Sequence, residues 1–165
     1  MGRESVADRM IAIGADHGGV ELKDALVAAL HERGERVVDV GTTGDASVDY
    51  PDFGRAVAER VSRGEAERGI LICTNGIGMS IVANKFPGVR AALVADATAA
   101  RMAREHNDAN VLVLGGGMMG KFHARELLGI FLDTPFGGGR HQGRIDKIAE
   151  IEQELGTRRE KGALR

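Results

Sequence analysis

The 165-residue sequence contains one cysteine, three prolines, no tryptophan and no long apolar run. A single cysteine cannot form an intramolecular disulfide, which is consistent with a reducing cytoplasm. The N-terminal segment MGRESVADRM lacks the apolar stretch of a signal peptide. No apolar run approaches the roughly 20 residues needed to span a bilayer. We therefore expect a cytoplasmic protein with no membrane partner.

A surplus of basic residues is also absent, because the formal net charge is −2 and the isoelectric point is about 6.2. Nucleic acid is therefore not an expected partner, since the phosphate backbone attracts clustered positive charge. Glycine, in contrast, is abundant: 24 glycines gather in short groups at the ends of apolar runs. Such groups are typical of loops that turn with positive φ or bring the backbone close to a ligand.

Short apolar runs alternate along the chain with longer stretches of helical period. A short apolar run predicts a buried strand, and apolar residues three and four apart predict a helix. No hairpin signal interrupts the alternation, so we expect a five-stranded parallel sheet with helices on both faces, a three-layer, doubly wound, Rossmann-like α/β fold. The expected strands are residues 10–15, 36–40, 69–73, 90–94 and 110–115, and the expected helices are 22–30, 53–61, 79–85, 96–106 and 124–131, with a loop at 42–52.

These patterns divide the chain into three parts. We expect residues 1–9 to be a flexible N-terminus, residues 10–138 to be the doubly wound domain, and residues 139–165 to be a C-terminal helical arm. The arm is mostly polar but keeps a partial helical stripe of apolar residues: Ile145, Ile148, Ile151 and Leu155. Such an arm packs either on a partner subunit or on its own domain, and the pattern leaves both open. The last ten residues, GTRREKGALR, are expected to fray.

Four segments rich in glycine and polar residues lie at the ends of the expected elements. They are Asp16–Gly19 after the first strand, Thr74–Gly78 after the third, Gly115–Gly117 at the end of the fifth, and His106–Asp108 at the end of the helix before the fifth. Because sites in doubly wound folds lie beyond the carboxyl ends of the strands, we expect all four to meet at one edge of the sheet. That edge would hold a carboxylate, an imidazole, a thiol and free backbone amides.

Each candidate residue also has a plain structural interpretation. Cys73, at the end of a buried strand, can be a small buried hydrophobe or a reactive thiolate near the N-terminus of a helix. His17 and His106 can be structural histidines, and Asp16 can cap the helix that follows it. The glycine loop after Cys73 could bind an anion or stabilise an enediolate oxyanion, yet it matches neither the dinucleotide-binding fingerprint nor the P-loop.

A basic cluster stands in the segment GGGRHQGR, which places Arg140, His141 and Arg144 among glycines. Arginine pairs bind phosphate in bidentate geometry, although a solvated basic turn would have the same sequence. Combined with the thiol, the imidazole and the glycine loop, the cluster suits the transfer of a proton between adjacent carbons of a small anionic sugar. A non-catalytic binding module for a small anion or a nucleotide is the alternative from another class.

Six separate blocks of the sequence resemble the type B ribose-5-phosphate isomerases, a family that includes galactose-6-phosphate isomerase subunits and related aldose–ketose isomerases. The blocks run in order from about Ile11 to Glu152: IGADHGG, VDVGT, DYPDFG, GILICTNGIGMSIVANKFPGVRAAL, EHNDANVLVLG and GGGRHQGRIDKI. The resemblance implies an isomerase of the pentose phosphate pathway that uses no metal and no cofactor and interconverts ribose 5-phosphate and ribulose 5-phosphate. It also implies a homodimer or dimer of dimers in which two chains build each site.

The resemblance assigns a role to each candidate residue. It makes Cys73 the base that moves the proton between C1 and C2 of the sugar. It implies that the enediolate oxygens are bound by the backbone amides of Asn75, Gly76, Ile77 and Gly78. It implies that His106, with Asp16 nearby, assists opening of the furanose ring. The remaining implied roles are contacts to the sugar from Asn107 and Tyr50, and to the phosphate from His17, Arg140 and Arg144.

Two positions depart from the family pattern. Asn75 stands where the family usually has a threonine or serine, whose hydroxyl is thought to relay a proton between O1 and O2. An amide donates and accepts hydrogen bonds but does not readily pass a proton on. Gly117 stands where many members carry a phosphate-binding arginine. Other substrates therefore stay open: a tetrose, allose or galactose phosphate, or an unphosphorylated sugar.

Overall fold

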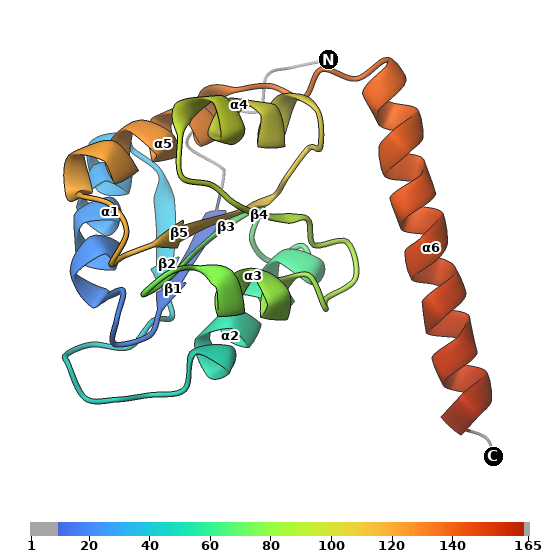
Figure 1. Ribbon diagram of the computed structural model, residues 1–165, viewed down its shortest axis with the longest axis horizontal. Coiled ribbons are helices and arrows are strands. Elements are labelled where there is room, and N and C mark those ends of the chain that lie inside the picture. The colour runs from blue at the N-terminus through green and yellow to red at the C-terminus, as the bar shows by residue number, and fades with distance from the viewer. Residues whose placement is uncertain (1–9, 164–165) are drawn as a thin grey trace.

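The computed structural model describes residues 10–163, so the N-terminus expected to be flexible lies outside the described residues. Strands and helices alternate from β1 to α5, as predicted, and a further helix, α6, follows α5 (Figure 1). The strands are β1 (Met10–Ala15), β2 (Arg36–Asp39), β3 (Arg68–Cys73), β4 (Ala91–Leu93) and β5 (Val111–Gly115). The helices are α1 (Val20–Glu32), α2 (Tyr50–Ser62), α3 (Ile77–Ala83), α4 (Ala97–Glu105), α5 (Lys121–Asp133) and α6 (Arg140–Ala163).

The five strands form one parallel sheet in the order β2-β1-β3-β5-β4, which places β1, β3 and β5 at its centre. Helices α1, α4 and α5 cover one face, and α2 and α3 cover the other (Figure 1). Alternate residues of β3 enter the two cores, because successive side chains of a strand point to opposite faces. Ile70 and Ile72 pack toward α1 and α5, whereas Leu71 and Cys73 pack toward α2 and α3. The predicted three-layer, doubly wound fold is confirmed.

The loop between β2 and α2 is shorter than predicted. α2 begins at Tyr50, so the loop expected at 42–52 ends at Asp49. Pro51 fits the first turn of the helix, because the N–H that proline lacks would have no acceptor within that turn. The earlier start brings the Tyr50 ring to the carboxyl edge of the sheet, beside the loop that follows β3.

Helix α6 stands beside the domain rather than in a layer (Figure 1). It is helical as far as Ala163, which includes most of the residues expected to fray. The Gly88 N–H donates to the Glu152 carboxylate at 2.9 Å, and a groove of about 680 Å³ lies between the helix and β4. The arm thus touches its own domain, yet about half of the surface of its apolar stripe stays exposed: Ile148, Ile151 and Leu155. No helix within residues 10–163 is long and apolar enough to cross a membrane.

A buried lysine fixes α1 to the end of β2. The Lys23 side chain is 1% exposed, and its ammonium donates to the carboxylates of Asp24 and Asp39. Burial disfavours the charged ammonium, but the hydrogen bonds to Asp39 and Asp24 outweigh it and raise the pKa of Lys23 above its ordinary value. Asp39 also accepts the Gly41 N–H at 2.9 Å. The Lys23–Asp39 pair therefore orients the chain at the end of β2, where the loop at the carboxyl edge begins.

We expect Asp39→Asn to lower the free energy of unfolding by about 1–3 kcal/mol, because it weakens the pairing of a buried cation. Lys23→Met should lower the free energy of unfolding by less, since it leaves no buried charge and the freed Asp39 carboxylate is 33% exposed. Urea denaturation measures both. The control is Lys121→Met, which breaks the exposed Lys121–Glu21 pair and should change stability by less than about 1 kcal/mol. An Asp39→Asn variant as stable as this control would contradict the prediction.

Candidate active site

The tips of the three central strands meet at the carboxyl edge of the sheet. The Gly116 N–H donates to the Cys73 carbonyl at 2.7 Å, and the Gly117 N–H donates to the Thr74 carbonyl at 2.9 Å. On the other side, the Asp16 N–H donates to the Ile72 carbonyl at 3.3 Å. The prediction that the glycines after β5 supply free amides is therefore wrong for Gly116 and Gly117, because the carbonyls of Cys73, at the end of β3, and of Thr74, which follows it, accept these N–H groups.

Cys73 ends β3 and is 6% exposed. Its sulfur accepts the Gly76 N–H at 3.1 Å, so the following loop curls back over the thiol. Gly76 has φ of +79°, and a Cβ there would lie 2.5 Å from Leu93 Cδ1 and 3.2 Å from the Leu114 carbonyl oxygen. Only glycine fits this turn without strain. Cys73 is thus both packed in the core under α2 and α3 and hydrogen-bonded to the loop.

The loop from Asn75 to Gly78 presents hydrogen-bond donors at this edge. The Asn75 Oδ1 accepts the Ile77 N–H at 3.0 Å, which turns the side chain back over the loop and leaves its Nδ2 free to donate. In the part of the chain that the structure describes, the N–H groups of Gly78 and Met79 have no hydrogen-bond acceptor. Tyr50 closes one side, since a Cβ at Gly78 would lie 2.5 Å from the Tyr50 ring.

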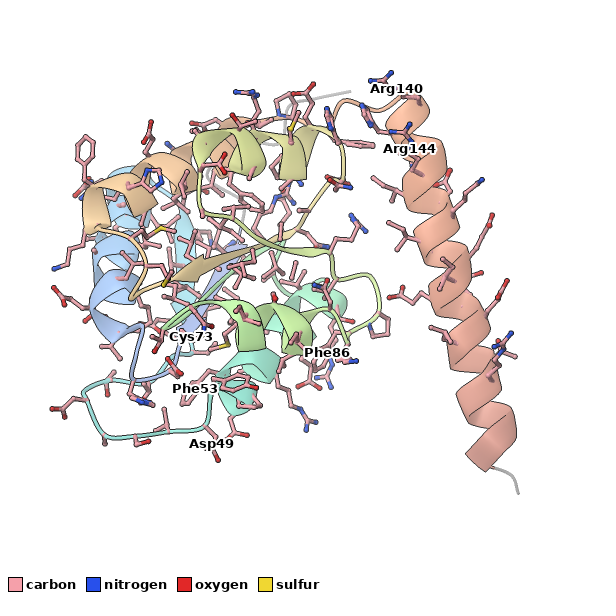
Figure 2. All side chains as sticks on the ribbon, in the orientation of Figure 1. Asp49, Phe53, Cys73, Phe86, Arg140 and Arg144 are labelled. Atoms are coloured by element: carbon pink, nitrogen blue, oxygen red, sulfur yellow. The ribbon has the colours of Figure 1, made fainter. Side chains whose placement is uncertain are left out.

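Asp16 and His17 complete the carboxyl-edge group. Asp16 is 6% exposed, and its Oδ1 accepts the Gly18 N–H at 3.0 Å. His17 Nδ1 accepts the Val48 N–H at 3.2 Å, which ties the loop before α2 to the tip of β1. In the neutral ring the proton must then lie on Nε2, so His17 offers an N–H donor to an anion. Figure 2 shows Asp49 and Phe53, which flank Tyr50, at the same end of the molecule as Cys73.

Sequence reasoning placed Thr74 in a segment at this edge but gave its side chain no role. Thr74 lies between Cys73 and Asn75, and its Oγ1 would be only 2.3 Å from a Cβ on Gly18. Its methyl group would lie 3.2 Å from a Cβ on Gly117. The threonine therefore fills the space that these two glycines leave open. Its place next to the only cysteine in the sequence was the available signal.

The prediction that His106–Asp108 lies at the same edge as Cys73 is wrong. α4 starts beyond the carboxyl end of β4 and returns to the start of β5, so its own end lies at the amino edge. The Asn110 N–H donates to the Arg90 carbonyl at 3.0 Å, which places this turn where β4 begins. Cys73 pairs with Gly115 at the opposite end of β5. Four residue steps of about 3.3 Å separate the two edges by about 13 Å of sheet.

A second cluster forms at the amino edge. The rings of His106 and His141 stack with centroids 4.3 Å apart and planes 10° from parallel. Arg140 and Arg144 lie on the first turns of α6, and Figure 2 shows them far from Cys73. Asn107 lines the groove beside α6. The sequence-predicted residues therefore form two groups, the thiol group at the carboxyl edge and the imidazole–arginine group at the amino edge.

The positive charges of the amino edge act on His141. Partial burial of the ring is the main cause that lowers the pKa of His141, and the charges of His106, Arg140 and Arg144 lower it further. The unfolded chain therefore binds the proton more readily than the folded chain. The contribution of His141 to stability is present above pH 6.5, the ordinary value, and is lost as pH falls through the lowered pKa.

We expect the His141 ring protons to titrate below pH 6.5 in an NMR experiment. Arg140→Ala should raise this midpoint toward the ordinary value, because it removes one repelling charge. His123 is the internal control: hydrogen bonds to the Ala95 carbonyl and to Glu126 raise its pKa, and Arg140→Ala should leave it unchanged. A His141 midpoint that does not move in Arg140→Ala would contradict the electrostatic cause.

A doubly wound sheet with a thiol, a carboxylate and a glycine loop at its carboxyl edge is typical of α/β proteins that bind small molecules at that edge. The chain belongs to the ribose/galactose isomerase family, whose family model matches residues 11–148. It is 44% identical over 145 residues to ribose-5-phosphate isomerase B of Escherichia coli, covering 88% of this chain and 97% of that protein. It is 40% identical over 146 residues to D-erythrulose-4-phosphate isomerase of Pectobacterium atrosepticum, covering 87% and 95%.

A solved structure agrees with the sequence relatives. The ribose-5-phosphate isomerase B of Clostridium thermocellum superposes with a TM-score of 0.87 at 51% sequence identity, covering 88% of this chain and 99% of that one. The expected fold and family are confirmed, and the protein is an isomerase. The names of these relatives include more than one sugar phosphate, so the family alone does not fix the sugar.

Proposed function

We propose that this protein interconverts ribose 5-phosphate and ribulose 5-phosphate at a site made by two copies of the chain. The carboxyl edge of one copy supplies the thiol group of residues, and the amino edge of the other supplies the imidazole and the arginines. One observation carries this proposal: a single chain holds both groups at opposite edges of its sheet. Neither group alone is complete, because the carboxyl edge lacks the imidazole of His106 and the arginines, and the amino edge lacks the thiol.

In this scheme Cys73 acts as a thiolate base. It takes the proton from C2 of the open-chain aldose, and the electron pair of that C–H bond becomes the C1–C2 double bond of an enediolate. The negative charge develops on O1, where donors of the Asn75–Gly78 loop can bind it. The thiol of Cys73 then returns the proton to C1, and the hydroxyl proton of O2 ends on O1. The product is the ketose, and the thiolate is restored.

Asn75 takes a donor role in this scheme. Its Oδ1 is occupied by the Ile77 N–H, so its free Nδ2 can stabilise the oxyanion. An amide nitrogen does not pass its proton on, so a water molecule or Cys73 moves the proton between O2 and O1. His106 from the other copy, with Asp16, opens the furanose ring, while Tyr50 and Asn107 contact the sugar.

The phosphate group would bind between the two copies. His17 offers its Nε2–H from the carboxyl edge, and Arg140 and Arg144 come from the first turns of the other copy's α6. Gly117 adds no side chain to this anchor. The anchor therefore depends on His17 and on the other copy's arginines, which suits a small sugar with a terminal phosphate.

A substrate panel tests the proposed function. The purified protein is assayed with pentose, tetrose and hexose phosphates and with the unphosphorylated sugars. Ribose 5-phosphate should give the highest kcat/KM, and unphosphorylated ribose should react far more slowly. If a tetrose 4-phosphate is the best substrate, the proposed sugar is wrong, but the proposed isomerisation mechanism still stands. Tight binding of a nucleotide with no turnover of any sugar would overturn the isomerase and favour a binding module.

A further inference from the structure

Asp108 adopts a backbone conformation that side chains rarely take. Its φ is +44°, and within residues 10–163 it is the one residue other than glycine with positive φ. Such a conformation costs free energy and persists only where its surroundings enforce it, often at functional sites. Asp108 directly follows His106 and Asn107, the two amino-edge residues assigned to the sugar.

Backbone hydrogen bonds close the end of α4 around these two residues. The Asp108 N–H donates to the Arg104 carbonyl at 3.1 Å, and the Ala109 N–H donates to the Ala103 carbonyl at 2.9 Å. Both bonds span His106 and Asn107, so the left-handed residue after them sets the shape of the turn. Helix ends commonly use glycine or asparagine at such a position. An aspartate there adds a charge that those residues lack.

Two arginines bind this carboxylate. Arg104 Nη1 donates to Asp108 Oδ1 at 2.8 Å, and Arg90 Nη2 donates to Oδ2 at 3.3 Å. Arg104 is only 4% exposed, donates to the Ala109 carbonyl at 2.6 Å and lies 5.7 Å from the centre of the Phe131 ring. It is thus fixed in the core beneath the turn.

Arg90, the residue before β4, binds the same turn. Its Nε donates to the carbonyls of Asn107 at 3.1 Å and Asp108 at 3.0 Å. One guanidinium therefore contacts both the backbone and the carboxylate of the turn, and Asp108 links it to Arg104. On the outer side, the His106 ring stacks on His141.

We propose that Asp108 is a positioning residue for the isomerisation. Its carboxylate, bound between Arg104 and Arg90, holds the His106–Asn107 turn so that the imidazole and the amide reach the sugar held by the other copy. The inference rests on the proposed function, in which these two side chains act on the substrate. Orientation matters because a displacement of about 1 Å can cost about 100-fold in rate.

Three variants separate the effect of the Asp108 carboxylate on kcat from the effect of the backbone conformation. Asp108→Ala removes the charge and disfavours positive φ, and it should lower kcat by about 10–100-fold with a smaller change in KM. Asp108→Gly relieves the strain but lacks the carboxylate, so it should stay as slow. Asp108→Asn tolerates positive φ and keeps one side-chain oxygen that can accept from Arg104, so it should recover part of kcat. The control, Asp133→Ala, removes an exposed aspartate that pairs with Arg33 and should leave kcat unchanged.

NMR of the histidine rings supplies a readout that does not depend on turnover. In the wild type the stacked His106 and His141 rings should shift each other's proton signals, and Asp108→Ala should remove most of that shift. Wild-type kcat in Asp108→Gly would overturn a role for the carboxylate, and unchanged histidine signals in Asp108→Ala would overturn positioning. A wild-type protein without isomerase activity, or a fully active His106→Ala, would instead refute the proposed function. Should Asp108→Ala fail to fold, Asp108→Gly, which removes the carboxylate without backbone strain, tests it by both readouts, and unchanged kcat or unchanged histidine signals there would overturn the proposal.

Discussion

Cys73→Ala is expected to abolish the exchange of the C2 proton of ribose 5-phosphate with deuterated water. A positioned general base contributes about 10²–10⁴-fold to such a reaction, and its loss should lower kcat by at least that factor. The measurement is the disappearance of the C2 proton signal by NMR, followed together with formation of the ketose. Exchange at the wild-type rate would show that another group is the base.

The matched control for this variant is Cys73→Ser. A serine oxygen can still accept the Gly76 N–H, which the Cys73 sulfur accepts at 3.1 Å, so it preserves the shape of the loop. Its hydroxyl is not ionised near neutral pH and is therefore a far weaker base than a thiolate. We expect Cys73→Ser to be inactive as well, and to unfold in urea close to the wild type. An active serine variant would point to a role of Cys73 in holding the loop rather than in chemistry.

Mixing two inactive variants is expected to restore activity when their changes lie at opposite edges of the sheet. Cys73→Ala damages the carboxyl edge, and Arg140→Ala damages the amino edge. If two chains of a symmetric dimer share each site, half of the dimers in an equal mixture are mixed, and each mixed dimer has one intact site of two. The activity should therefore rise from near zero to about one quarter of the wild-type value.

The control for this experiment pairs two changes at one edge. Cys73→Ala and His17→Ala both damage the carboxyl edge, so every mixed dimer has a defect in each site and no activity should return. Refolding the variants together, followed by size-exclusion chromatography, confirms that chains exchange. Absence of recovery in the first pair, with exchange demonstrated, would contradict a shared site and would require His106 and Arg140 to act elsewhere.

The local pattern of the sequence predicted most of the fold. Alternating apolar runs specified five parallel strands, and the periodic spacing of apolar residues specified the helices between them. The helix expected from residue 96 begins there because the Asp96 side chain accepts the Ala99 N–H, a contact only three residues long. The start of α2 was not read correctly, since Pro51 was taken as a loop residue although proline is also common in the first turn of a helix.

The placement of His106 was within reach of the sequence but was predicted wrongly. A helix between two parallel strands carries the chain from the carboxyl edge back to the amino edge, so the predicted order of elements already implied where α4 ends. The residue types were informative about chemistry, because a thiol, an imidazole and paired arginines suit proton transfer on an anionic sugar. Their arrangement in two groups required the topology to be followed to the end of each helix.

The sequence by itself determined the order of the strands and helices, the two faces of the core, the family and the residues able to do chemistry. These follow from contacts between residues close in the chain and from short motifs. Only the tertiary structure decided that the carbonyls of Cys73 and Thr74 accept the Gly116 and Gly117 N–H groups, that Tyr50 covers Gly78, and that Arg104 and Arg90 bind Asp108. Each of these joins segments far apart in the sequence, and local periodicity carries no information about which distant groups fold to within hydrogen-bonding distance.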